Sequence, residues 1–391
     1  MTPLKRTLIE HIRETGPITV AQFMAACLYD PRHGYYAREP RIAGDGDFIT
    51  GPEISQMFGE LIGLWCVHEW DVLGRPAPFQ LMELGPGNGA LIADAWRAAR
   101  IEPAFRDAAQ VHLIEVSNVL RGRQAEALAR FDVRARWHER VDAAPVSAGF
   151  VIANEFFDCL PIRQFVRTDD GWRERLIGVT NQGELQFGLG GLAQDPLLLR
   201  GGGRGWGAAR MLEGSHRSPI EFTEHSASPH PLTPSSQEEG EMIGVVHEVA
   251  PALEAWVDVL AQRLKSAPGR ALIIDYAGDG AGDTLQAVRA HTKESPLEAP
   301  GDADLTARVD FVALKILARA SGLQVHGPAD QGSFLAALGL HQRAEALAAA
   351  HPERAARIGR EVARLTDADQ MGVLFKAICL SSPNLPPPAG F

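Results

Sequence analysis

The spacing of apolar residues predicts an α-helical beginning to the chain. Leu4, Leu8 and Ile12 fall on one face of a first helix. A helical spacing of apolar residues recurs over a longer stretch, from about Ile54 to Leu73. We therefore expect residues 1–75 to form an N-terminal helical cap.

From residue 76 onward, short apolar runs alternate with helical patterns. This alternation predicts an α/β fold, with helices on both faces of a doubly wound, mainly parallel sheet. We expect a Rossmann-like domain over residues 76–391, an antiparallel edge strand near its end, and a frayed Pro-rich tail at 383–391. The predicted strands are Phe79–Leu84, Val111–Val116, Phe150–Ala153, Ala271–Tyr276 and Val373–Leu380.

Residues 162–241 interrupt this alternation. Short alternating runs between Ile162 and Phe187 predict antiparallel hairpins. Residues 188–241 are rich in Gly, Pro and Ser and show little periodicity, which is typical of a flexible segment. We therefore expect a hairpin and flexible lid insertion at 162–241, after the fourth strand of the sheet, Phe150–Ala153.

A Gly-rich turn directly follows the first predicted strand, with the sequence Glu83-Leu-Gly85-Pro86-Gly87-Asn-Gly89. Glycines there allow positive φ and close approach of the backbone to a ligand, and the next helix begins with free N–H groups. The carboxylate of Glu83 would repel a pyrophosphate but would attract a cationic ligand that carries hydroxyl groups. S-adenosylmethionine, with an ammonium, a sulfonium and a ribose, has this chemistry.

The same turn also fits a dinucleotide-binding pattern, through Gly85, Gly87 and Ala90. In that pattern an acid binds the ribose about 20 residues further on. The next predicted strand carries Glu115, which is later than expected. Acids on both strands, Glu83 and Glu115, favour a methyltransferase in which Glu115 binds the ribose hydroxyls. An NAD-dependent oxidoreductase is the alternative enzyme.

Composition and charge narrow the choice of partners. The chain has 391 residues and a formal net charge of −11, which argues against broad binding to nucleic acid or to an anionic membrane surface. Its four cysteines are far apart, and no His, Cys or carboxylate spacing predicts a metal site. No apolar stretch has the length of a signal core or a membrane span. We expect a cytoplasmic protein without membrane insertion.

Six short segments along the chain carry a family resemblance: 46–55, 83–89, 112–117, 153–158, 283–289 and 304–311. In order they resemble the MidA-like family of class I S-adenosylmethionine-dependent methyltransferases, whose mitochondrial members are protein arginine methyltransferases that assist assembly of respiratory complex I. The resemblance covers Leu4 to Leu380 and is weakest at 188–241. It implies a seven-stranded sheet, S-adenosyl-L-methionine as cofactor, and a protein substrate such as the quinone-site subunit of complex I or its bacterial equivalent.

The segment Asn154-Glu155-Phe156-Phe157-Asp158 follows the fourth strand, at the mouth of the expected crevice. If the acceptor is arginine, the carboxylates of Glu155 and Asp158 can hold its guanidinium by forked, charge-assisted hydrogen bonds. Phe156 can pack on the guanidinium plane, and Asn154 can contact cofactor or acceptor. Alternatively, Asn154 caps a turn and the two phenylalanines are core residues.

The N-terminal loop supplies further candidates for a substrate site or lid. By resemblance it closes over cofactor and substrate, while Thr50 or Ser55 with Glu53 can equally cap the long helix. The candidates in this loop are Asp47, Thr50, Pro52, Glu53 and Ser55.

Two later segments hold the remaining candidates. Asp275 and Tyr276 end a strand at the same edge of the sheet. Asp304, Thr306 and Asp310 either line the site or cap the helix that starts near Arg308, and capping is favoured for Asp310.

Two other functions are compatible with these residues. One is an assembly chaperone that keeps the methyltransferase fold but acts by binding a partner. The other is a methyltransferase for a small molecule.

Overall fold

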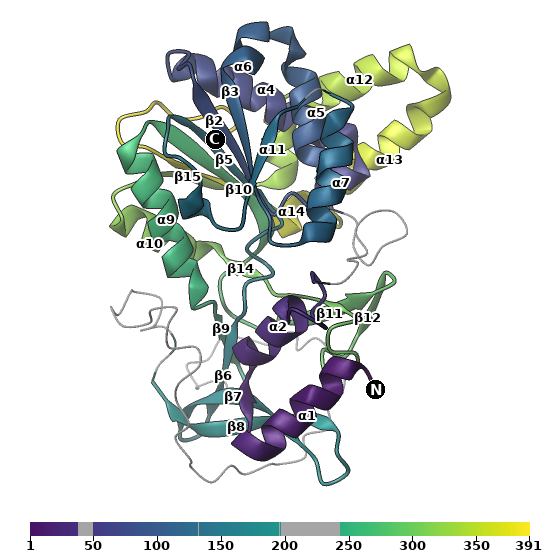
Figure 1. Cartoon of the computed structure of the whole chain (residues 1–391), viewed down its shortest axis with the longest axis vertical. Helices are drawn as coiled ribbons and strands as arrows, with labels where there is room; N and C mark the ends of the chain where they lie inside the picture. The colour runs from purple at the N-terminus through teal and green to yellow at the C-terminus, as the bar shows by residue number, and fades with distance from the viewer. Residues whose placement is uncertain (38–49, 132, 195, 197–242) are drawn as a thin grey trace.

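The computed structural model describes residues 1–37, 50–131, 133–194, 196 and 243–391. Its main sheet follows the order β15-β16-β10-β5-β2-β3-β4, and a short eighth strand, β14, pairs with β10 (Figure 1). The strands β4, β3, β2, β5 and β10 are mutually parallel, whereas β16 and β15 are antiparallel to their neighbours. The strands are β2 (Phe79–Leu84), β3 (Ala109–Ile114), β4 (Ala135–His138), β5 (Gly149–Asn154), β10 (Gly269–Gly278), β14 (Val309–Asp310), β15 (Gln324–Asp330) and β16 (Phe375–Ser381).

Successive side chains along each strand point to opposite faces of this sheet, and both faces are buried in a hydrophobic core. In β5, Phe150 and Ile152 belong to one core with helices α4 and α5, whereas Val151 and Ala153 belong to a second core with α9 and α10. The class I fold with seven strands along the sheet is therefore confirmed. The helices around this sheet are α3 (Gly51–Ile54), α4 (Gln56–Val72), α5 (Ala90–Ala98), α6 (Pro103–Ala108), α7 (Asn118–Ala129), α9 (Ala252–Ser266), α10 (Phe311–Ala320), α11 (Gln331–Ala337), α12 (Leu340–Ala350), α13 (Ala355–Thr366) and α14 (Met371–Leu374).

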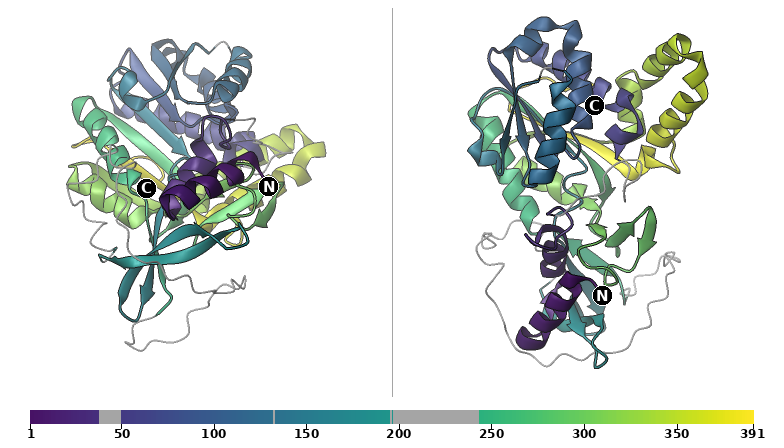
Figure 2. Two further views of the ribbon diagram at one scale, coloured as in Figure 1. Left: turned by 60° about the horizontal axis from the view of Figure 1, so that its bottom comes forward. Right: turned by 45° about the vertical axis from the view of Figure 1, so that its right-hand side comes forward.

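A third core joins segments that are far apart in the sequence, and we call the elements around it the small lobe. Apolar residues of α1 and α2 pack there with Ile177 of β7 and Leu305 of β13. The remaining elements, around the main sheet, form the sheet lobe; the two lobes lie one above the other (Figure 2). The small lobe contains α1 (Pro3–Thr15), β1 (Ile18–Thr19), α2 (Val20–Tyr29), β6 (Arg163–Thr168), β7 (Gly171–Val179), β8 (Leu185–Ala193), β9 (Val246–Val249), β11 (Gln286–Arg289), β12 (Thr292–Glu294) and β13 (Asp304–Thr306).

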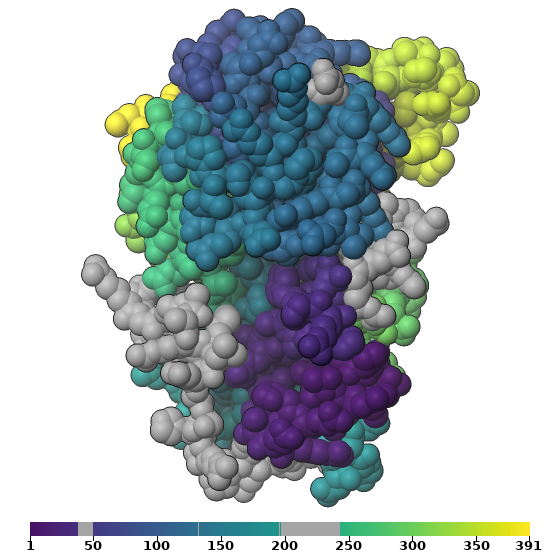
Figure 3. All heavy atoms as spheres, in the orientation of Figure 1, coloured from purple at the N-terminus to yellow at the C-terminus, as the bar shows by residue number. Residues whose placement is uncertain are grey.

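The N-terminal helices do not all pack in the same place. The long helix α4 packs on α5 and shares the core of the main sheet. In contrast, α1 and α2 belong to the small lobe, and these N-terminal residues (purple) lie directly below the sheet lobe (blue) in the space-filling view (Figure 3). We propose that the domains follow these cores, with α1 and α2 in the small lobe and α4 in the sheet lobe. This division differs from the expected boundary between residues 1–75 and 76–391.

The long helix predicted from about Ile54 to Leu73 is confirmed as α4, which Ser55 caps by accepting the N–H of Met57. Two other local expectations are corrected by the structure. The strand near the end of the chain is antiparallel as expected, but it lies between β10 and β15, so β15 is the edge. The tail is packed rather than frayed: Ala389 bonds Glu69 and Trp65, and Phe391 packs 5.1 Å from the ring of Phe334.

Candidate functional site

The Gly-rich turn lies where β2 ends and α5 begins. Gly85, Gly87 and Gly89 all have positive φ, of 59°, 55° and 83°, and Gly89 is the left-handed residue before the first turn of α5. The N–H of Gly85 donates to Ile114 at the end of β3, which holds the turn against the neighbouring strand. The turn thus places backbone groups at the carboxyl ends of the strands, where α/β sheets bind ligands.

Gly85 also has no room for a side chain. A Cβ atom built there would lie 2.8 Å from Cδ2 of Phe156, which in turn packs edge-on against Trp256 with 4.9 Å between ring centroids. Phe156 therefore forms one wall of the turn and supports the crevice by packing.

We expect Gly85→Ala to weaken binding of S-adenosylhomocysteine by roughly tenfold or more, because the added methyl displaces Phe156 and the positive φ disfavours any Cβ. Calorimetric titration of the folded variant measures this. Gly122→Ala is the matched control, since a Cβ at Gly122 meets no atom within 4 Å. Equal affinity of wild type and Gly85→Ala would contradict a close approach of ligand to this turn.

Glu83 is a buried carboxylate with an unsatisfied oxygen. Glu83 lies near the end of β2 and is only 3% exposed. Its Oε2 has no hydrogen-bond partner among the described residues. Burial raises the pKa of Glu83 to about 8, although a backbone hydrogen bond from Ile92 acts in the opposite direction. A buried acceptor of this kind requires a donor, and an ammonium group supplies both donor and charge.

Glu115 lies at the neighbouring strand end and is joined to the Gly turn by Gln124. Its Oε1 accepts the N–H of Ser117 at 2.8 Å, and its Oε2 accepts from the Gln124 amide at 3.1 Å. The same amide donates to the carbonyl of Gly87 at 2.9 Å, while Trp137 donates to Gln124 Oε1 at 2.8 Å. Burial raises the pKa of Glu115. One buried glutamine, Gln124, therefore holds the Gly turn and the Glu115 carboxylate in fixed positions relative to each other.

Gln124 is a site residue that the sequence analysis missed. A signal was present, because Gln124 occupies the apolar spacing of α7 between Leu120 and Leu128, and all three side chains are buried. A glutamine at such a position must find buried partners, which marks it as a bridging residue.

The turn after β5 carries the predicted acceptor residues and is held from the next strand. The carboxylate of Asp275, on β10, accepts the N–H groups of Phe156 at 3.0 Å and Phe157 at 2.7 Å. Glu155 adopts a left-handed φ of 50°, which is a strained conformation for a glutamate. Its Oε1 accepts from the Asn154 amide at 3.1 Å. Asp275 thus positions the turn, and Glu155 is held in an orientation that an unconstrained chain rarely adopts.

Three carboxylates cluster at this turn: Asp275 is completely buried, whereas Glu155 and Asp158 are partly exposed. Desolvation raises the pKa of Glu155 and that of Asp275 to about 7. It also raises the pKa of Asp158, with contributions from the charges of Asp275, Glu155 and Asp304. None of Glu155, Asp158 and Asp275 has an ion-pair partner within the part of the chain that the structure describes. The charge of Arg364 lowers the pKa of Glu155 only partly. Clustered acids that lack a close ion pair are typical of a functional site for a cation.

The raised pKa of Glu155 has a measurable effect on stability. Its folded value of about 7 lies above the ordinary value of 4.5, so the native state holds the proton more tightly than the unfolded chain does. The contribution of Glu155 to stability is therefore complete below about pH 4.5 and is lost as the pH rises through 7. Glu155→Gln does not titrate. We expect it to gain on the order of 2 kcal/mol relative to wild type between pH 5 and pH 8.

Urea denaturation of both proteins at the two pH values measures this difference. A wild type that loses no more stability than Glu155→Gln over this range would show that the carboxylate is not buried in a protonated form.

The N-terminal loop residues reach the site through α3. The N–H of Gly51 donates to Glu155 Oε1 at 2.8 Å, and Glu53 accepts from Asn88 of the Gly turn at 3.2 Å. Pro52 is a buried residue of α3. Of the two predicted caps, Ser55 bonds the N–H of Met57, whereas Thr50 makes no side-chain capping bond. Asp47 lies outside the described residues.

The later candidates have mixed positions. Tyr276 follows Asp275, and its ring packs with Phe375 and under the guanidinium of Arg308. Thr306 is buried and accepts from the Gln286 amide at 3.2 Å, so its hydroxyl is engaged within the small lobe. Asp310 caps α10 by accepting the N–H groups of Val312 and Ala313, as expected.

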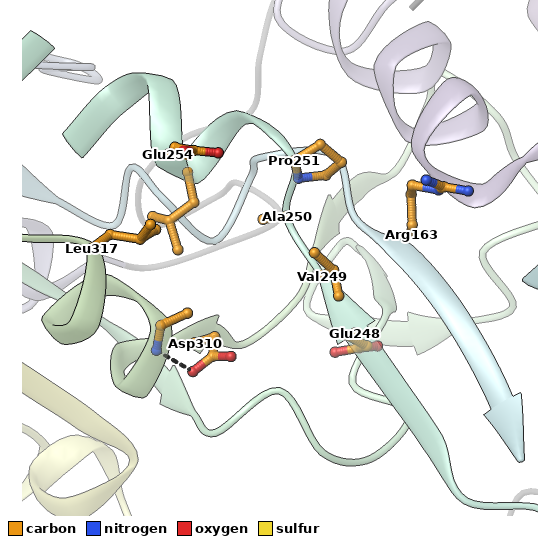
Figure 4. Close-up of a pocket in the computed structure, with 10 residues that line it drawn as sticks. Arg163, Glu248, Val249, Ala250, Pro251, Glu254, Asp310 and Leu317 are labelled. Atoms are coloured by element: carbon orange, nitrogen blue, oxygen red, sulfur yellow. Dashed lines mark hydrogen bonds between the residues drawn. The ribbon is translucent and has the colours of Figure 1, made fainter. Parts of the chain in front are cut away.

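A pocket near the start of α9 lies apart from this crevice. Its walls come from Arg163, Glu248, the beginning of α9 and the first turns of α10 (Figure 4). None of the residues that line it belongs to the Gly turn or to the carboxylate cluster, and Asp310 there is engaged in capping.

The described ranges are 1–37, 50–131, 133–194, 196 and 243–391. They contain no helix that is long and apolar enough to span a membrane. They also contain no group of three or more His, Cys, Asp or Glu side chains placed to hold a metal ion.

Comparison with solved structures defines the class. The chain matches a Burkholderia thailandensis protein crystallised with S-adenosylhomocysteine, with a TM-score of 0.79 at 24% identity over 99% of this chain and 93% of that one. A native structure from the same organism matches with a TM-score of 0.77 at 25% identity. The likeness establishes the fold, and together with the Gly turn and its two acids it defines a class I methyltransferase.

Sequence comparison then identifies the family. Residues 61–329 match the profile of a family described as S-adenosyl-L-methionine-dependent methyltransferases. The chain is 35% identical to the "Protein arginine methyltransferase NDUFAF7 homolog, mitochondrial" of Drosophila melanogaster, over 96% of this chain and 84% of the relative. It is 33% identical to the Rattus norvegicus protein of that description, with similar coverage. The chain belongs to this MidA-like methyltransferase family, and its cofactor is S-adenosyl-L-methionine, as the sequence predicted.

Proposed function

We propose that the protein is a protein arginine N-methyltransferase whose acceptor guanidinium binds at Glu155 and Asp158. The observation that carries this proposal is the cluster of desolvated carboxylates, none of which has a close ion-pair partner among the described residues. A guanidinium supplies the missing charge and the N–H donors in one planar group. The relatives named protein arginine methyltransferases support the same acceptor.

The cofactor fits the residues at the strand ends. Glu83 has a buried oxygen that no described residue bonds, which suits the ammonium group, and Glu115 is held by Gln124 at the position expected for a ribose. Gly85, Gly87 and Pro86 form the floor between them, where a Cβ at Gly85 would collide with Phe156. S-adenosylmethionine held by these residues would supply the methyl group of its sulfonium for transfer to nitrogen.

The protein's own residues then orient the acceptor and take up a proton. Glu155 and Asp158 hold the guanidinium so that one nitrogen faces the methyl group. Methylation of this nitrogen leaves one proton in excess, and Glu155, with a pKa of about 7, can accept it near neutral pH. Asn154 keeps Glu155 oriented through the 3.1 Å hydrogen bond, and its Oδ1, which has no partner in the described part of the chain, can accept from either ligand.

We further propose a subunit of respiratory complex I, or its bacterial equivalent, as the physiological substrate, in keeping with the MidA-like family. A cytoplasmic location stays a prediction, since the relatives are named mitochondrial proteins.

Methylation of matched peptides tests the reaction. We expect transfer of labelled methyl groups from S-adenosylmethionine to a peptide of the complex I subunit that contains arginine, and none when lysine or citrulline replaces that arginine. Methylation of all three peptides would place the acceptor elsewhere and contradict the proposal. Tight binding of S-adenosylhomocysteine without transfer to any arginine would favour the chaperone or the small-molecule enzyme instead.

A further inference from the structure

Residues of the small lobe contact the segment that carries the carboxylate cluster. The hydroxyl of Tyr29, at the end of α2, donates to the carbonyl of Cys159 at 3.0 Å, next to Asp158. The N–H of Ala307 donates to the carbonyl of Asp158 at 2.9 Å. Small-lobe residues therefore bond the backbone carbonyls of both Asp158 and its neighbour Cys159, although this segment follows a strand of the sheet lobe.

Two tyrosines present aromatic surface beside these acids. The rings of Tyr29 and Tyr36 are stacked, with centroids 5.8 Å apart and planes 29° apart. The Tyr36 hydroxyl donates to Asp304 Oδ1 at 3.3 Å, which ties the stack to another carboxylate. Tyr29 is 40% exposed even though its hydroxyl is bonded, so part of its ring remains open to a ligand.

The pKa shifts agree with the proximity that these hydrogen bonds show. Burial of the hydroxyl end raises the pKa of Tyr29 and that of Tyr36, and the negative charges of Asp158 and Asp304 also raise both. Asp304 also contributes to the raised pKa of Asp158. The tyrosines and the acids of both lobes therefore lie within electrostatic reach of one another.

An independent observation indicates that this space takes a hydrogen-bond donor. Asn154 is only 9% exposed, and its Oδ1 has no hydrogen-bond partner among the described residues. Its amide nitrogen bonds Glu155, which places the side chain at the cluster. A buried acceptor left open beside several acids calls for a cation rich in N–H groups.

From this geometry we infer that Tyr29, Tyr36 and Asp304 of the small lobe complete the arginine-acceptor site begun by Glu155 and Asp158. The inference rests on the proposed function and adds to it the residues that select the acceptor. Carboxylates bind the edge of a guanidinium, while an aromatic ring binds its face, so the combination prefers arginine to the compact ammonium of lysine. The acceptor is then held between the two lobes.

Steady-state kinetics with an arginine peptide test these roles. We expect Tyr29→Leu and Asp304→Asn each to raise KM for the peptide by roughly tenfold, with kcat and S-adenosylhomocysteine affinity within about threefold of wild type. Tyr29→Phe keeps the aromatic face and should restore a KM near that of wild type. Glu298→Gln, which removes an exposed charge from the same segment as Asp304, is the matched control.

A second measurement separates this inference from the proposed function. Calorimetry of the full chain saturated with S-adenosylhomocysteine uses N-acetyl-arginine amide as the probe and the lysine analogue for comparison. Weaker probe binding by Tyr29→Leu and Asp304→Asn than by wild type and Glu298→Gln supports the inference. Wild-type methylation of arginine with unchanged KM and probe affinity in both variants would overturn the inference and leave the function standing. A wild type that binds S-adenosylhomocysteine but neither binds the probe nor methylates arginine would overturn both.

Discussion

Glu155→Gln is expected to lower kcat for arginine methylation by about 100-fold or more while leaving S-adenosylhomocysteine affinity almost unchanged. The amide cannot accept the proton that the acceptor nitrogen loses, and positioned proton acceptors typically contribute factors of about 10² to 10⁴. Glutamine has the same shape and can still accept the N–H of Gly51, which lies 2.8 Å from Oε1. Single-turnover measurement of methyl transfer to an arginine peptide provides the comparison.

The pH dependence sharpens this test. In the wild type, the rate should rise as the pH increases through about 7, because the carboxylate of Glu155 must be ionised to accept a proton. The residual activity of Glu155→Gln should lack this rise. An isosteric control, Glu184→Gln, removes an exposed carboxylate that pairs with Lys5 in the small lobe and should retain both rate and profile. A Glu155→Gln enzyme within threefold of wild type would exclude Glu155 as the proton acceptor.

The same substitution is predicted to stabilise the protein above neutral pH and to inactivate it. This combination follows from one cause, because a buried carboxylate without a cation lowers the stability of the free protein and provides the binding energy for a cationic acceptor. Burial of the Asp275 carboxylate also lowers the stability of the free protein, although this carboxylate accepts three backbone N–H groups, two after β5 and one in β10. The cluster is therefore better explained by ligand binding than by structural stability.

Much of the sheet could be predicted from the sequence because its central strands are continuous apolar runs. β2, β5 and β10 are buried along most of their length, and a glycine or an acid marks where β2 ends. β4 was missed because its four residues are only partly buried, and β15 because Gly327 and Pro328 interrupt it. Strand order is a matter of tertiary packing, which is why β16 was mistaken for the edge.

The site was predictable only where its residues are consecutive in the sequence. The Gly turn and the segment 154–158 each form a local pattern, and the structure brings both to the carboxyl ends of neighbouring strands. Neither Tyr29 nor Tyr36 was among the candidate site residues. Tyr36 bonds Asp304 across more than 260 residues of intervening sequence. A contact of this kind depends on how the small lobe assembles from separate segments.

Far from the site, Arg270→Ala is expected to cause the largest loss of stability, about 3–5 kcal/mol. Arg270 Nε lies 2.7 Å from Glu69 Oε2, and both side chains are almost completely buried, at 0% and 1% exposure. The guanidinium also donates to Ser381 on β16 and to the carbonyl of Pro386, while Glu69 accepts the N–H of Ala389. One buried ion pair thus joins α4, the central strand β10 and the C-terminal tail.

Removal of either partner leaves the other charge buried without compensation, and this desolvation accounts for most of the loss. Urea denaturation of Arg270→Ala and Glu69→Ala should show similar destabilisation, and the double variant should lose much less than the sum of the two. Arg75→Ala is the matched control: Arg75 pairs with Asp71 at the same 2.7 Å, but both side chains are more than half exposed, so little change is expected. Equal effects of the buried and exposed pairs would show that burial does not set the strength of this contact. Additive losses at Arg270 and Glu69 would show that each stabilises the tail independently, through Pro386 and Ala389.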